Sequence, residues 1–113
     1  MTLRRRKQSD SIQATLDLLV LKTLSRSPQH GYGIARHIEA VTDDVLKVEE
    51  GSLYPALHRM EQSGWIVAEW KQTPNNRRAR MYRITRDGRK QLTRAEQHWT
   101  QLTQAIGKLL RFA

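Results

Sequence analysis

One short stretch of the chain sets hydrogen-bonding side chains at the spacing of a helix. Counted at about 100° per residue from Leu53, its apolar residues gather on one side, and a polar set lies opposite or at the flanks. This polar set is Ser52, Tyr54, Pro55, His58, Arg59 and Gln62. Arginine pairs with guanine edges and glutamine with adenine edges, so the outer face of such a helix has the chemistry to contact bases. Each of these residues taken alone is also typical of an ordinary solvated surface.

The other residues of chemical interest form no recognisable catalytic or metal site. The four histidines, at positions 30, 37, 58 and 98, lack the spacing of a metal site. An acidic cluster over residues 43–50 lacks the spacing of a calcium-binding loop. The chain has no cysteine, which excludes disulfides, thiolate metal sites and cysteine nucleophiles, and suits a reducing cytoplasm. We therefore expect no enzymatic activity, no cofactor and no metal.

The positive charge of the chain is concentrated in two places. The 113 residues include 20 lysines and arginines against 11 acidic residues, which gives a formal net charge of +9. One basic cluster covers residues 4–7 and the other covers residues 71–94. The second cluster places cations on both sides of a turn, namely Lys71, Arg77, Arg78 and Arg80. This distribution favours a polyanionic partner, whose phosphates these cations would contact.

The elements that would position these side chains follow from the periodicity of the apolar residues. Helical spacing predicts two helices between residues 12 and 41, and a third over residues 51–62. Ser52 is expected to cap the third helix, with Pro55 in its first turn. Gly64 is expected to follow that helix in a left-handed conformation.

After the third helix, the spacing of the apolar residues changes from helical to alternating. Residues 65–71 and 79–85 alternate on either side of a turn cluster, which predicts a β-hairpin, and Thr85 is expected to cap a long fourth helix. Three helices, a hairpin and a further helix make a winged helix-turn-helix, a mainly α fold with a small β-hairpin. In this fold the third helix enters the major groove of DNA, and a basic hairpin lies on the backbone or in the minor groove.

These elements divide the chain into three parts. Residues 1–11 are expected to form a basic flexible arm, residues 12–85 a winged helix-turn-helix DNA-binding domain, and residues 86–113 a C-terminal dimerisation helix. The arm is interpreted either as a minor-groove arm or as a disordered tail. The sequence shows no targeting segment and no apolar run long enough to cross a membrane.

The fourth helix carries an apolar seam whose members are spaced alternately three and four residues apart. They are Leu92, Ala95, Trp99, Leu102, Ile106 and Leu109. Such a heptad pattern is typical of association between two helices, so a homodimer is expected; the alternative is packing against the first helix of the same domain. Trp99 has two interpretations, as a packing anchor or as a stacking platform for a flat aromatic effector between two copies.

Several short motifs follow one another in a characteristic order. They are His30-Gly31-Tyr32-Gly33-Ile34, Val48-Glu49-Glu50-Gly51-Ser52-Leu53-Tyr54-Pro55-Ala56-Leu57, Gly64-Trp65-Ile66, Asn76-Arg77-Arg78, and Tyr82-Arg83-Ile84-Thr85 followed by Gly88. Over roughly residues 12–100 this ordered set closely resembles the PadR family of transcriptional regulators. The single C-terminal helix is similar to the short branch of that family.

The resemblance implies a homodimeric bacterial regulator, in most cases a repressor, that binds double-stranded DNA. It implies DNA contacts from the helix that begins at residues 52–55 and from Arg77 and Arg78 of the hairpin. It also implies a small aromatic molecule near the dimer interface as a candidate effector. Dimeric helix-turn-helix proteins bind palindromic sites, so a palindromic operator is expected. Two alternatives stay open: a basic RNA-binding protein, and a ligand-sensing dimer that no longer reads DNA.

Overall fold

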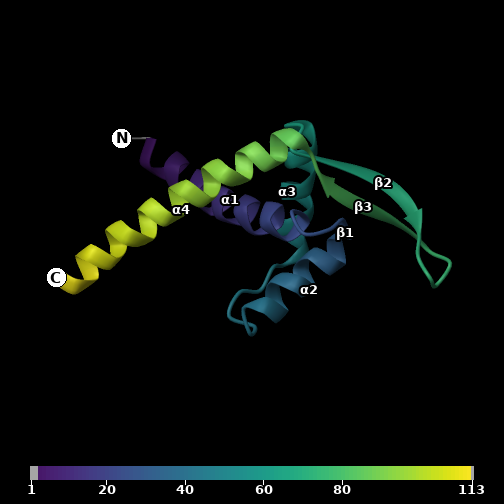
Figure 1. The fold of residues 1–113 in the computed structure, drawn as a ribbon, viewed down its shortest axis with the longest axis horizontal. Coiled ribbons are helices and arrows are strands. Elements are labelled where there is room, and N and C mark those ends of the chain that lie inside the picture. Colours follow the sequence, from purple (N-terminus) through teal and green to yellow (C-terminus); the bar gives the residue numbers. More distant parts are fainter. Residues whose placement is uncertain (1–2, 113) are drawn as a thin grey trace.

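The described part of the chain folds into four helices and three strands. The computed structural model describes the backbone of residues 3–112 and the side chains of residues 13–111. In chain order the elements are α1 (Leu3–Leu24), β1 (Gln29–His30), α2 (Gly31–Val41), α3 (Glu50–Gln62), β2 (Ile66–Gln72), β3 (Arg78–Ile84) and α4 (Arg86–Phe112) (Figure 1). This order confirms the predicted winged helix-turn-helix fold.

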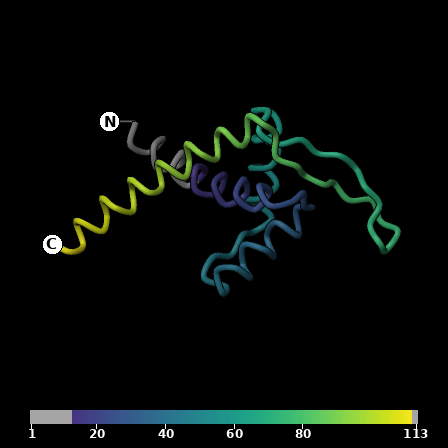
Figure 2. Tube along the Cα trace, in the orientation of Figure 1, coloured from purple at the N-terminus to yellow at the C-terminus, as the bar shows by residue number. Residues whose placement is uncertain are grey.

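The strands form one antiparallel sheet in the order β1-β3-β2. β2 and β3 pair along their whole length, with Ile66 opposite Ile84 at the base of the hairpin. We call this hairpin, residues 66–84, the wing; Figure 2 shows it reaching away from the helices to a free tip. β1 adds a short edge strand in which Gln29 lies opposite Tyr82. The sequence did not predict β1, because two residues are too few to show an alternating pattern.

A single apolar core joins the helices to the base of the wing. Apolar residues recur on one face of α2 and α3 and at the C-terminal end of α1, so these faces can be buried together. The buried apolar side chains are Val20, Leu21, Leu24, Ile34, Ile38, Leu53, Ala56, Leu57, Met60, Ile66, Tyr82, Ile84 and Leu92. The apolar positions that helical spacing predicts for α3, namely Leu53, Ala56, Leu57 and Met60, are all in this set. Packing therefore fixes the inner face of α3 and leaves its polar face outward.

The start of α3 lies earlier than the sequence predicted. Its N-cap is Glu49 and not Ser52, because the N–H groups of Ser52 and Leu53 already donate to the Glu49 carbonyl, at 3.0 and 2.9 Å. Pro55 consequently lies inside the helix and not in its first turn. A proline there removes the hydrogen bond that the Gly51 carbonyl would accept. Gly51 is exposed, so water can solvate that carbonyl instead.

The predicted cap after α3 and the predicted cap of α4 are both confirmed. Gly64 has a φ of +79°, the expected left-handed conformation. The Thr85 hydroxyl donates to the Gly64 carbonyl at 2.7 Å and accepts from the Gly88 N–H at 3.0 Å. A side chain at Gly88 would collide with the Trp65 carbonyl, so the close approach of α4 to the base of the wing requires glycine. These contacts fix where α4 begins relative to α3.

The N-terminal part of the chain differs from the prediction. Residues 3–11, expected to belong to a flexible arm, are part of α1. This stretch is rich in arginine, lysine, glutamine and leucine, which are good helix formers, and this accounts for the longer helix. The side chains of residues 3–12 lie outside the described part. A role for this segment in the minor groove therefore stays a prediction.

Candidate nucleic-acid interface

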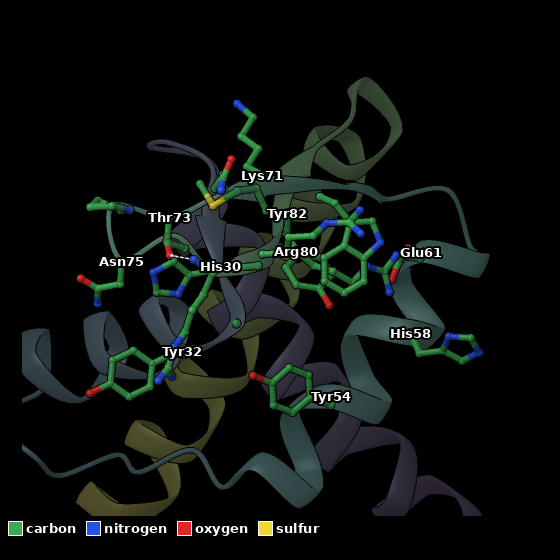
Figure 3. Close-up of a pocket in the computed structure, with 18 residues that line it drawn as sticks. His30, Tyr32, Tyr54, His58, Glu61, Lys71, Thr73, Asn75, Arg80 and Tyr82 are labelled. Carbon is green, nitrogen blue, oxygen red and sulfur yellow. Dashed lines mark hydrogen bonds and ion pairs between the residues drawn. The ribbon is translucent and has the colours of Figure 1, made fainter.

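An open groove lies between α3 and the wing. Its volume is about 1050 Å³, and α3, both strands of the wing, its tip and the start of α2 contribute side chains to it. Figure 3 shows Tyr54, His58 and Glu61 on α3 across from Arg80 and Tyr82 of β3. We call this space the inner groove. It brings the exposed face of α3 and the cations of the wing to the same side of the molecule.

Five of the six side chains predicted for the outer face of α3 are exposed. They are Ser52, Tyr54, Pro55, His58 and Gln62. Tyr54 also packs closely on α2, since a Cβ atom added to Gly31 would lie 2.8 Å from the Cε1 atom of Tyr54. Gly31 thus lets α2 and α3 approach each other at the point where α2 begins. The exposed set is placed as predicted, and its contacts with bases stay a prediction.

Arg59, the sixth member of that set, lies elsewhere, and its prediction as a base-reading residue is corrected. Its guanidinium makes two hydrogen bonds to the carboxylate of Asp17 in α1, at 2.7 and 2.9 Å. Arg59 lies about 120° from Leu53 around α3, at the edge of the buried face, so its long side chain can turn inward. Hydrogen bonding to Asp17 raises the pKa of Arg59 above its usual range, against the lowering effect of burial. The pair joins α3 to α1.

Replacing Arg59 by methionine is therefore expected to destabilise the fold. Methionine retains an apolar stem but leaves the carboxylate of Asp17, a buried residue, without its partner. Breaking a buried ion pair costs about 3–5 kcal/mol, and since Arg59 is partly exposed we expect about 2–3 kcal/mol. Urea unfolding measures this change, and the double variant Asp17→Asn/Arg59→Met should recover part of it. A loss below about 0.5 kcal/mol would contradict the structural role of the pair.

The tip and edge of the wing hold three cations that remain accessible. Lys71, Arg77 and Arg78 are exposed, as predicted. Lys71 has one carboxylate nearby, that of Glu69 at 3.6 Å, and because both side chains are exposed this pair is weak. The guanidinium of Arg78 lies 5.2 Å from the ring centroid of Trp70, a cation–π contact that orients it along the wing. These three cations can contact a polyanion without breaking a strong bond.

Arg80, the fourth predicted wing cation, is paired with a carboxylate and is only partly exposed. Its guanidinium makes a hydrogen bond of 2.8 Å with the Glu61 carboxylate of α3. It also lies 5.8 Å from the ring centroid of Trp70 and 5.7 Å from that of Tyr82. Burial raises the pKa of Tyr82 above its usual range, and the Arg80 guanidinium opposes this rise. The prediction of Arg80 as a free phosphate contact is thus corrected, and sequence reasoning missed both Glu61 and Trp70.

Comparison with known proteins agrees with this architecture. The family model described as "Transcriptional regulator PadR-like family" matches residues 20–94. The chain belongs to this PadR-like family. A transcriptional regulator from Clostridium thermocellum has a similar structure, with 29% identity, a TM-score of 0.79, and coverage of 88% of this chain and 96% of that one. A PadR-like transcriptional regulator from Bacillus cereus gives 25% identity, a TM-score of 0.76, and coverage of 92% and 99%.

One curated relative matches over a shorter stretch. Transcriptional regulator Rv3488 of Mycobacterium tuberculosis is 45% identical over 47 residues, which are 42% of this chain and 43% of that protein. PadR-like proteins are transcription regulators and not enzymes. Within the described residues, no three histidine or acidic side chains form a metal-binding group. No helix there is both long and apolar enough to span a bilayer.

PadR-like regulators bind DNA and commonly dimerise, and α4 carries the surface predicted for dimerisation here. Leu92 is only 6% exposed and belongs to the core of its own chain, so its prediction as an interface residue is corrected. Ala95 is half-buried beside α1. Beyond it the seam is uncovered, with exposures of 44% at Trp99, 42% at Leu102, 46% at Ile106 and 67% at Leu109. Figure 1 shows this half of α4 extending past the other elements.

The two sequence interpretations of α4 concern different halves of the seam, and the dimer stays a prediction. Near its start the helix packs on its own domain, and Lys22 of α1 pairs with Glu96 at 3.5 Å. From Trp99 onward the apolar side chains have no such cover in the described chain. An exposed apolar stripe of this kind is typical of a protein–protein interface, and its role in a dimer of this chain stays a prediction. The role of Trp99 in binding an aromatic effector stays a prediction.

Proposed function

We propose that the protein is a DNA-binding transcriptional repressor that binds a palindromic operator as a homodimer, acting in the cytoplasm of a bacterial cell. The observation that carries this proposal is the inner groove, which sets the exposed face of α3 beside the cations of the wing. In the proposed complex α3 enters the major groove, and the wing lies on the backbone or in the minor groove. One strand of the sugar-phosphate backbone would pass through the inner groove.

Affinity and sequence preference would come from different elements in this complex. The exposed outer face of α3 holds no lysine or arginine after the correction of Arg59, so bases would be read by hydrogen-bonding side chains such as Gln62 and His58. Glutamine pairs with adenine, and each good base contact discriminates by about 1–3 kcal/mol. The exposed wing cations Arg77 and Arg78 would neutralise phosphates of any sequence. The wing therefore attracts DNA, and α3 selects the site.

A homodimer would place two such surfaces on one duplex. The apolar seam from Trp99 to Leu109 supports association through α4, because an exposed heptad stripe is stabilised by a second helix. A two-fold dimer reads two half-sites in opposite orientation, with centres about 34–36 Å apart for one turn of DNA. The expected operator is thus an inverted repeat. Repression would follow where that repeat overlaps a promoter.

Selection of bound duplexes from a random-sequence pool tests this proposal. We expect enrichment of an inverted repeat with half-site centres about one helical turn, or a small multiple of it, apart. The selected duplex should compete for the protein far better than a scrambled duplex or a hairpin RNA of equal length. Preferential competition by the RNA would favour the RNA-binding alternative. Failure to enrich any duplex would favour a dimer that no longer reads DNA.

A further inference from the structure

The surroundings of Arg80 differ from those of every other cation on the wing. The side chain of Arg80 is 39% exposed and that of its partner Glu61 is 22% exposed, whereas Arg77 and Arg78 are exposed. The Nε atom of Arg80 is buried and has no hydrogen-bond partner among the described residues. An N–H group in this state lowers stability unless the contacts around it compensate. The pose of Arg80 must therefore be held by its other contacts.

Those contacts come from both strands of the wing and from α3. Trp70 lies opposite Arg80 in the register of the hairpin, so their side chains share one face of the wing. The rings of Trp70 and Tyr82 both lie within 6 Å of the Arg80 guanidinium. Glu61 reaches the same guanidinium from α3, at 2.8 Å. Figure 3 shows Arg80 and Tyr82 on the strand, with Glu61 facing them from the helix.

We propose that the Glu61–Arg80 pair is a latch that fixes the wing relative to α3, and that Glu61 is a positioning residue for DNA binding. The inference rests on the proposed function. The base of the wing is already fixed, because β2 follows α3 closely and Ile66 is buried. Toward the tip the wing is exposed on both faces, and within the described residues the Glu61–Arg80 pair is the side-chain hydrogen bond that joins it to α3. The latch would set the distance between the helix in the major groove and the wing cations on the backbone.

This proposal and simple electrostatics make opposite predictions for Glu61. The carboxylate lines the groove through which a phosphate backbone would pass, so its negative charge alone opposes DNA. On electrostatic grounds Glu61→Gln should therefore tighten binding and make it more sensitive to salt. If the pair is a latch, the same variant releases the wing, and binding of the operator becomes weaker. The sign of the change separates the two accounts.

The experiment measures affinity for the selected operator duplex across a range of salt concentrations. For Glu61→Gln and for Arg80→Met we expect about tenfold weaker binding, typical of a lost coupling between two contacting residues. The slope of log affinity against log salt should stay unchanged in Arg80→Met, since a latched Arg80 contacts no phosphate. Loss of a phosphate contact would instead lower the slope by about 0.9. The double variant Glu61→Gln/Arg80→Met should bind about as well as either single variant.

Glu69→Gln is the matched control. Glu69 is the neighbour of Trp70 on β2, so its side chain lies on the opposite face of the wing, and it carries the same charge. This variant should bind the operator as tightly as the wild type or slightly more tightly. Thermal unfolding of each variant shows whether the domain itself is intact, and the charge-reversed pair Glu61→Arg/Arg80→Glu should recover part of the lost affinity.

The outcomes separate this inference from the function on which it rests. If the wild-type protein binds no duplex, the proposed function fails. If the wild type binds and Glu61→Gln binds more tightly, or Arg80→Met lowers the salt slope by about one contact, the function stands and the latch is refuted. Equal losses in Glu61→Gln and in the Glu69→Gln control would also refute it.

Discussion

Replacing Trp99 by glutamate is expected to convert the protein from a dimer into a monomer. Trp99 begins the exposed half of the α4 seam and is followed on the same stripe by Leu102 and Ile106. In the proposed dimer its ring is buried between two copies, and a carboxylate in that place would be buried without a partner. Such burial costs several kcal/mol, so the dissociation constant should rise by on the order of a hundredfold or more. Sedimentation velocity over a range of protein concentrations measures the change.

Gln97→Glu is the matched control for that substitution. Gln97 is exposed and lies two residues before Trp99, which places it about 200° away around the helix. The Gln97→Glu substitution adds the same charge to the same helix, but on the face away from the seam, so the protein should remain a dimer. A Trp99→Glu protein that still sediments as a dimer would place the interface on another surface. Because each half-site alone is bound weakly, the monomer should also lose most of its affinity for an inverted repeat.

The fold could be predicted from the sequence because its elements depend on local patterns. Leu53, Ala56, Leu57 and Met60 recur at helical spacing in α3, and all four are buried in the structure. Gly64 and Thr85 occupy the cap positions that their residue types favour. Each of these features involves residues close together in the chain. Periodicity and capping chemistry therefore carry enough information to place them.

The ion pairs of Arg59 and Arg80 could not be predicted in this way. Arg59 pairs with Asp17, which is 42 residues away in the sequence, and Arg80 pairs with Glu61, which is 19 residues away. Both arginines stand at the boundary between a buried and an exposed face, where a long side chain can turn either way. Which way it turns depends on a carboxylate supplied by another element. A helical wheel gives the position of the Cβ atom and not the direction of the guanidinium.

The seam of α4 shows a second limit of prediction from the sequence. Its heptad spacing continues without interruption from Leu92 to Leu109, yet the structure divides it into a part that packs on its own domain and a part that is exposed. The division lies where α4 leaves the side of α1, which depends on how α4 is anchored by Thr85 and Gly88. The two sequence interpretations of the seam were therefore not exclusive. Packing on the same domain describes the first part of the helix, and the exposed part is available for the proposed dimer.

Replacing both Arg77 and Arg78 by glutamine is expected to weaken binding to every DNA sequence alike. The two side chains stand exposed beside the turn of the wing, and the Arg78 guanidinium lies against the Trp70 ring. If each neutralises one phosphate, the slope of log affinity against log salt should fall by about 1.8 in total. Affinity at about 0.1 M salt should fall by about ten- to a hundredfold, with the preference among operator variants unchanged.

Lys108→Gln/Arg111→Gln is the control that separates a phosphate contact from a general loss of positive charge. These residues lie near the C-terminal end of α4, and Figure 1 places that end opposite the tip of the wing. The control removes the same two charges, but beyond the Debye length of about 10 Å at 0.1 M salt they act only weakly on the DNA. The salt slope should therefore stay close to that of the wild type.

If both double variants lower the slope equally, the attraction comes from net charge, and the wing has no special place on the backbone. If only the wing variant lowers it, and the ranking of operator variants is preserved, the wing supplies affinity while the face of α3 supplies the sequence preference.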